Sequence, residues 1–80
     1  MERQSRIEIL AGILLEARRG ATKTEIMNEN GLTASQVEEY LCFLQQSDLL
    51  RKQEGSGLFR PTDKGVGLIG DYERINRAID

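Results

Sequence analysis

The feature that most constrains the fold is a pair of helix starts that follow one another closely. In a capping box, a Ser or Thr hydroxyl and a Glu or Gln side chain three residues later satisfy backbone N–H groups in the first turn of a helix. The chain carries two such boxes in close succession, Thr22 with Glu25 and Thr33 with Gln36. Gly31 lies just before the second box, where glycine commonly ends a helix. The pattern predicts a short helix over 23–30 and a longer helix over 34–47.

A first helix is predicted before this pair. A further box, formed by Ser5 and Glu8, opens it, and Gly20 ends it, which gives a range of about 6–19. One face of this helix is expected to point inward with Ile7, Leu10, Leu14 and Ala17. A second apolar stripe adds Ile9 and Ile13. An apolar surface wider than one face predicts contact with two layers, such as the core and a later helix or a second subunit.

A β-hairpin is predicted after the longer helix. Two short extended segments, 49–53 and 58–61, flank a tip whose two glycines supply the positive φ angles of a tight connection. Alternation along the second segment places Phe59 in the core and Arg60 at the surface. The fold class is therefore predicted to be mainly α with a small β-hairpin.

The last helix is predicted over 63–80, with Thr62 as its cap. Its apolar residues follow a spacing of four, three and four, at Leu68, Tyr72, Ile75 and Ile79. This spacing is a short heptad seam, which predicts a homodimer interface. The alternative is that the seam folds back onto the helix over 6–19, where Ile9 and Ile13 offer a partner.

Composition excludes several classes of function. The 80 residues predict a single domain over 1–80, too small to enclose a large substrate cavity. The chain has no His and one Cys, so it lacks the commonest general base and metal ligand and cannot form an internal disulfide. We therefore expect no catalysis, no cofactor and no metal. A lone Cys suits a reducing cytoplasm, where we expect the protein to be. The apolar run over 7–17 is broken by charged residues and glycine, so we expect no membrane partner.

One glycine motif is a false match to a cofactor site. The segment Gly65-Val66-Gly67-Leu68-Ile69-Gly70 has the letters of the dinucleotide-binding fingerprint. That fingerprint requires a βαβ unit and an acidic residue about 20 positions later, and the sequence provides neither. Close packing of a helix, or a weak helix start caused by the low helix propensity of glycine, is the better interpretation of these glycines.

Charge is unevenly distributed, although the net charge is only −2. Residues 24–48 contain five acidic residues and neither Lys nor Arg, whereas 49–64 contain four basic residues and two acidic ones. Basic residues on and beside a hairpin suit the phosphates of DNA. Outward Lys and Arg also protect the edge of a hairpin from pairing with another chain, and this alternative remains open.

The order of the predicted elements leads to a family resemblance. A short and a longer helix joined by a three- or four-residue turn with Gly form the pattern of a helix-turn-helix. The residues that carry the resemblance are Arg3 to Gly20, Ala21-Thr22-Lys23-Thr24-Glu25-Ile26-Met27, Gly31-Leu32-Thr33, Tyr40-Leu41, Leu49-Leu50 and Thr62-Asp63-Lys64-Gly65. Through them, nearly the whole chain resembles the small archaeal winged helix-turn-helix DNA-binding proteins.

This resemblance implies a regulator of transcription that binds double-stranded DNA and dimerises through its C-terminal helix. The helix over 34–47 would enter the major groove, and the hairpin tip over 54–57 would lie at the backbone. The candidate DNA-binding residues are Lys23, Ser35, Gln36, Arg51, Lys52, Arg60 and Lys64. Gln36 is explained equally well as the capping partner of Thr33.

The outward face of the helix over 34–47 departs from the family pattern. It begins without Lys, Arg or an aromatic residue and carries Glu38 and Glu39. A carboxylate near a phosphate is repulsive, although Glu can accept a hydrogen bond from cytosine N4. The plainer interpretation of both residues is a solvated helix face. The competing hypothesis for the whole chain is a module that binds another protein and has lost DNA binding.

Overall fold

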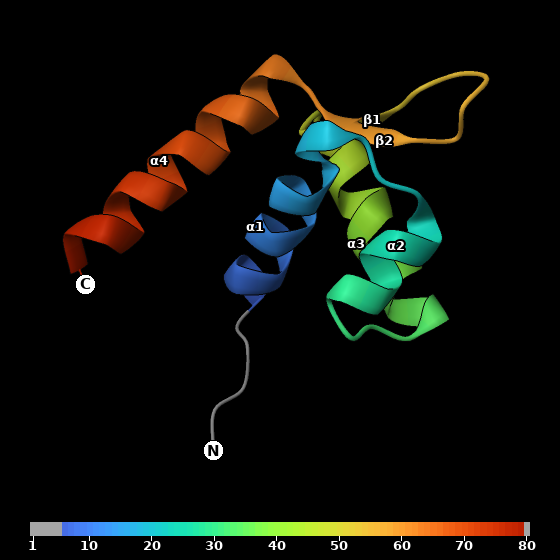
Figure 1. The fold of residues 1–80 in the computed structure, drawn as a ribbon, viewed down its shortest axis with the longest axis horizontal. Coiled ribbons are helices and arrows are strands. Elements are labelled where there is room, and N and C mark those ends of the chain that lie inside the picture. The colour runs from blue at the N-terminus through green and yellow to red at the C-terminus, as the bar shows by residue number, and fades with distance from the viewer. Residues whose placement is uncertain (1–5, 80) are drawn as a thin grey trace.

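The computed structural model describes residues 6–79, which form four α-helices and one β-hairpin (Figure 1). The elements are α1 (Arg6–Glu16), the 3-10 turn η1 (Ala17–Arg19), α2 (Lys23–Glu29), α3 (Ala34–Gln46), β1 (Leu50–Lys52), β2 (Phe59–Pro61) and α4 (Asp63–Ile79). The predicted fold class, mainly α with a small hairpin, is confirmed. Within the described residues, every helix is too short or too polar to span a lipid bilayer.

Both capping boxes at the paired helices are confirmed. Thr22 Oγ1 accepts a hydrogen bond from the Glu25 N–H at 3.1 Å, and Glu25 Oε1 accepts from the Thr22 N–H at 2.9 Å. In the second box, Thr33 Oγ1 accepts from Gln36 N–H at 3.1 Å and Gln36 Oε1 from Thr33 N–H at 3.0 Å. Gly31 lies between the helices at φ 62°, a conformation that favours glycine. These local bonds place α2 and α3 where the sequence predicts them.

The prediction for the first helix is correct in its bounds, because α1 and η1 together span 6–19, but it is wrong in part of its inward face. The α-helix ends at Glu16, and the last turn tightens into η1 before Gly20. Ile13 is fully buried in the core, whereas Ile7, predicted to point inward, is 64% exposed. The reason is that the core covers the second half of α1, while its first turn extends past the core. The predicted cap at Ser5 lies outside the described residues.

The hairpin is tied into the body of the protein by its second strand. β1 and β2 pair antiparallel, and Arg51 lies directly opposite Arg60. On its other edge, β2 exchanges two backbone hydrogen bonds with Ala21, because Phe59 N–H donates to Ala21 O at 2.8 Å and Ala21 N–H donates to Phe59 O at 3.1 Å. Phe59 is buried and Arg60 is exposed, as predicted.

The two strands are shorter than the predicted segments. The N–H of Leu49 donates to Leu44 O at 2.9 Å, so this residue closes the turn that follows α3 instead of beginning a strand. Asp48 supports this sharp exit with a positive φ of 61°. At the tip, Gly55 and Gly57 have φ angles of 87° and 72°, as the turn requires.

One apolar core joins the helices to the hairpin, and α4 contributes to it only near its start. The largest fully buried side chains are Ile13, Leu14, Ile26, Val37 and Leu44. In α4 only Gly65 and Ile69 are buried, and the helix diverges from α1 toward its C-terminal end (Figure 1). A Cβ atom at Gly65 would lie 2.2 Å from the carbonyl oxygen of Leu49. The predicted close packing is therefore correct for Gly65, whereas nothing described lies within 4 Å of a Cβ at Gly67 or Gly70.

Candidate nucleic-acid interface

α3 presents an exposed face that starts at its capped first turn. The side chains of Val37, Leu41 and Leu44 point inward and are buried. Ser35 and Gln36 are both exposed, as predicted. The side-chain oxygen of Gln36 accepts from the Thr33 N–H, so it is committed to the cap, and the NH₂ group remains as a donor.

The exposed side of α3 has two flanks with different neighbours. On the flank toward the hairpin, which we call the hairpin flank, α3 and the hairpin enclose a groove of about 590 Å³. The polar side chains that line it are Lys23, Glu38, Cys42, Gln45, Gln46 and Lys52. On the flank toward α1, Glu39 lines a hollow of about 160 Å³ together with Arg6 and Phe43. Glu38 and Glu39 are therefore parts of two different surfaces, although they are neighbours in the sequence.

Lys23 and Glu38 form an ion pair across the helix-turn-helix. Lys23 is the first residue of α2, and its Nζ donates to Glu38 Oε2 in the second turn of α3. Both side chains remain accessible, at 45% and 64% exposure. One predicted phosphate contact therefore already has an anionic partner within the chain.

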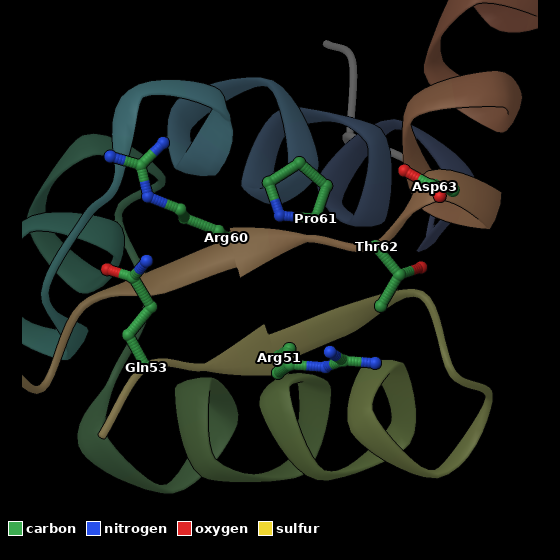
Figure 2. Close-up of a pocket in the computed structure, with 6 residues that line it drawn as sticks. All are labelled: Arg51, Gln53, Arg60, Pro61, Thr62 and Asp63. Atoms are coloured by element: carbon green, nitrogen blue, oxygen red, sulfur yellow. The ribbon is translucent and has the colours of Figure 1, made fainter.

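Four basic residues on and beside the hairpin are predicted to contact DNA, and they do not form one cluster. They are Arg51, Lys52, Arg60 and Lys64. Arg51 and Arg60 lie on the outer face and, with Gln53, line a hollow of about 290 Å³ (Figure 2). Their guanidinium groups are turned apart in Figure 2, as expected because directly opposed like charges repel. Lys52 lies on the opposite face, in the groove beside α3, with its Nζ 5.9 Å from the centre of the Phe59 ring. Successive strand residues alternate between faces, so this separation follows from the strand itself.

Two of the predicted cations also have contacts that join elements of the fold. Arg60 Nη1 donates to the carbonyl oxygen of Arg18 at 3.5 Å, and so links β2 to η1. Lys64 Nζ donates to the carbonyl oxygen of Ser47 at 3.2 Å, at the C-terminal end of α3, where a cation complements the helix. Both side chains therefore already bind backbone carbonyl groups when no DNA is present.

A second surface, which we call the α1–α4 groove, is apolar. It has a volume of about 410 Å³ and is lined from α1, α3 and α4. Its exposed apolar side chains are Ile7, Phe43, Leu68 and Ile75. Tyr72 also lines it and is half-buried. The predicted seam residue Ile79, in the last turn of α4, is 77% exposed.

The structure partly realises the alternative in which α4 packs on α1. Leu68 and Tyr72 share the groove with residues of α1, but Ile75 is 60% exposed. Ile13, expected as a partner for α4, belongs to the core instead. Phe43 was not among the predicted site residues, although a large apolar residue outside the inward face of α3 was a usable signal.

Another kind of site would be a cluster of metal-ligating side chains among the described residues. Within 6–79, no three His, Cys, Asp or Glu side chains gather as a metal site would require. Cys42 is an exposed free thiol on the hairpin flank. The surface therefore offers hydrogen bonds, charges and apolar contacts.

Comparison with known proteins agrees with this geometry. A search of the curated proteins gave no match. Residues 3–80 match the protein family described as winged helix-turn-helix, whose domains typically bind DNA. The match covers all the elements described above, from α1 to α4. The chain therefore belongs to the winged helix-turn-helix family, with α2 and α3 as its helix-turn-helix and the β1–β2 hairpin as its wing.

Proposed function

We propose that the chain is a cytoplasmic regulator of transcription that binds double-stranded DNA. In this proposal α3 enters the major groove and the wing lies against backbone phosphates. The observation that carries it is the hairpin flank, where an exposed helix face lies between Lys23 and Lys52. α3 has 13 residues and is about 20 Å long, and the major groove admits a helix of this kind.

The seven proposed DNA-binding residues fall into two groups by position. Ser35 and Gln36 begin α3, and Lys23 and Lys52 line its hairpin flank, so a duplex on α3 would meet these four first. The remaining three, Arg51, Arg60 and Lys64, lie on the outer face of the wing or at the start of α4. We propose that they contact phosphates of a duplex that extends past the wing.

The proposed homodimer would form through the α1–α4 groove and the end of α4. The occupant we propose is α4 of a second copy, because the exposed seam residues of one copy match the apolar groove of the other in character. Burying an Ile or Leu side chain stabilises an interface by roughly 1.5–3 kcal/mol. A symmetric dimer would present two α3 helices, and its half-sites would lie about 34 Å apart if the two helices face one side.

The test is duplex binding as a function of salt concentration. A labelled mixed-sequence duplex is titrated with the protein, and binding is followed by fluorescence anisotropy. We expect the logarithm of the binding constant to fall linearly with the logarithm of salt concentration, and the triple variant Arg51→Ala, Lys52→Ala, Arg60→Ala to bind more weakly with a shallower slope. If the wild type does not bind any duplex at low salt, the proposal is wrong.

The competing function is a module that binds another protein. It is favoured by Phe43, which is 52% exposed where α3 meets the α1–α4 groove. In that case, Phe43→Ser would abolish partner binding, whereas the triple variant of the wing would not. Weaker duplex binding in the triple variant would support the DNA-binding proposal instead.

A further inference from the structure

On the side of the helix-turn-helix that would face DNA, a carboxylate of the protein is paired with a lysine that a DNA phosphate could bind. We propose that the Lys23–Glu38 ion pair is a latch, in which Glu38 holds the ammonium group that a DNA phosphate takes in the complex. This inference rests on the proposed DNA binding and adds a residue, Glu38, that sets its affinity.

The position of the pair supports this role. Lys23 begins α2, Glu38 lies in the second turn of α3, and both line the groove between α3 and the wing. A duplex seated on α3 would pass directly over them. The pair is 15 residues apart in the sequence, so it forms only when the two helices are folded against each other.

The charge of the hairpin flank shows what the latch does. The charged side chains that line its groove are Lys23, Glu38 and Lys52. With Lys23 held by Glu38, Lys52 is the one cation of this groove, among the described residues, that has no acidic partner. DNA binding therefore begins with one available ammonium group and gains a second when a phosphate displaces the Glu38 carboxylate.

The latch is weak enough to open. An ion pair between two exposed side chains changes an equilibrium constant by about one- to fivefold, and it is screened by salt. A phosphate that takes the Lys23 ammonium group has to break this pair. The cost falls on every duplex alike, so the latch lowers nonspecific affinity.

Glu39 provides a matched control. It is one residue away and carries the same charge, but it lines the hollow toward α1 with Arg6 and not the groove of the hairpin flank. If only the total charge of α3 mattered, removing either carboxylate would have the same effect. If the latch exists, the two substitutions differ.

The experiment is a double-mutant cycle on duplex binding. Glu38→Gln, Lys23→Ala, the double variant and Glu39→Gln are compared with the wild type in a salt series on one mixed-sequence duplex. Glu38→Gln is expected to tighten binding at low salt by roughly two- to fivefold, and the gain should shrink as added salt screens the ion pair of the wild type. In the Lys23→Ala background the same substitution should have no such effect, and neither should Glu39→Gln.

Several outcomes would overturn the latch. A gain from Glu38→Gln that persists without Lys23 would mean simple repulsion between Glu38 and phosphate. Equal gains from Glu38→Gln and Glu39→Gln would mean a general charge effect. If the wild type binds DNA and Glu38→Gln gives no gain, the latch fails alone. If no variant binds any duplex, the proposed function fails and the latch with it.

A measurement without DNA checks the pair itself. The NMR signal of the Lys23 side-chain Nζ group should change on Glu38→Gln and stay in place on Glu39→Gln. Circular dichroism would confirm that each variant remains folded, as expected for exposed side chains whose backbone is held by the two capping boxes. An unchanged Lys23 signal in Glu38→Gln would contradict the pair.

Discussion

The hairpin flank of α3 and the α1–α4 groove are both exposed, but the side chains that line them differ in polarity. The hairpin flank is lined largely by amides, a thiol and charged groups, which can exchange water for another polar partner. The α1–α4 groove is lined mostly by aliphatic and aromatic side chains, which gain from losing water altogether. One small fold therefore separates a largely polar, charged surface from a largely apolar one. α3 belongs to both, because Cys42 lines the first and Phe43 the second.

The largest effect is expected where the start of α4 is joined to the rest of the fold. Gly65→Ala would place a Cβ atom 2.2 Å from the carbonyl oxygen of Leu49, so α4 would have to shift. We expect the free energy of unfolding to fall by about 1–3 kcal/mol, as for other overpacked sites. Urea denaturation followed by circular dichroism measures this change.

Gly67→Ala is the matched control, since nothing described lies within 4 Å of its Cβ position. It should raise the stability by up to about 1 kcal/mol through helix propensity. Equal effects of the two substitutions would contradict the close contact at Gly65.

The next largest effect is expected on the proposed dimer interface in the α1–α4 groove, and the hairpin flank should be unaffected. Ile75→Glu with Ile79→Glu should convert the proposed dimer to a folded monomer, because each substitution puts a charge where apolar surface would be buried. Sedimentation equilibrium measures the change. Asn76→Glu, at an exposed polar position of the same helix, is the control and should remain dimeric. A wild type that stays monomeric at high concentration would rule out the seam.

A smaller effect on stability is expected from removing the cap at the first turn of α3. Thr33→Ala removes the hydroxyl that accepts from the Gln36 N–H, and we expect the free energy of unfolding to fall by about 1 kcal/mol. Thr33→Ser keeps the hydroxyl and should retain most of the stability in the same urea titration. If both variants are equally stable, the cap does not contribute as described.

The smallest effect distinguishes the two faces of the wing. Lys52→Ala removes a cation beside α3, so the salt slope of DNA binding should become shallower by about 0.9. Arg51→Ala removes a cation from the outer face, and its effect should be smaller. A larger effect of Arg51 in the same anisotropy titration would mean that the outer face lies closer to the duplex.

Local signals in the sequence predicted the helix-turn-helix and the hairpin tip well. Capping boxes and glycines act within a few residues, so Thr22, Thr33 and Gly31 could be interpreted without tertiary structure. Arg51 and Lys52 lie on opposite faces of the hairpin. Strand alternation could have predicted this, but it was applied only to the second strand.

Other features depend on contacts that no local pattern contains. Periodicity showed that α1 is apolar but not which turns the core covers, so Ile7 and Ile13 were misplaced. Gly65 differs from the other glycines of α4 because the chain that leaves α3 passes close to it, at the carbonyl group of Leu49. The Lys23–Glu38 pair likewise depends on how α2 packs against α3.

The most direct test of the proposed DNA binding is to map by NMR the surface that a duplex contacts. Backbone amide signals of the protein are followed during titration with a duplex. We predict that the largest shifts lie on the hairpin flank, at Ser35, Glu38, Cys42 and Lys52, and that those of Ile7 and Leu68 in the α1–α4 groove stay nearly unchanged. Shifts concentrated in the α1–α4 groove, or none on the hairpin flank at low salt, would contradict the account.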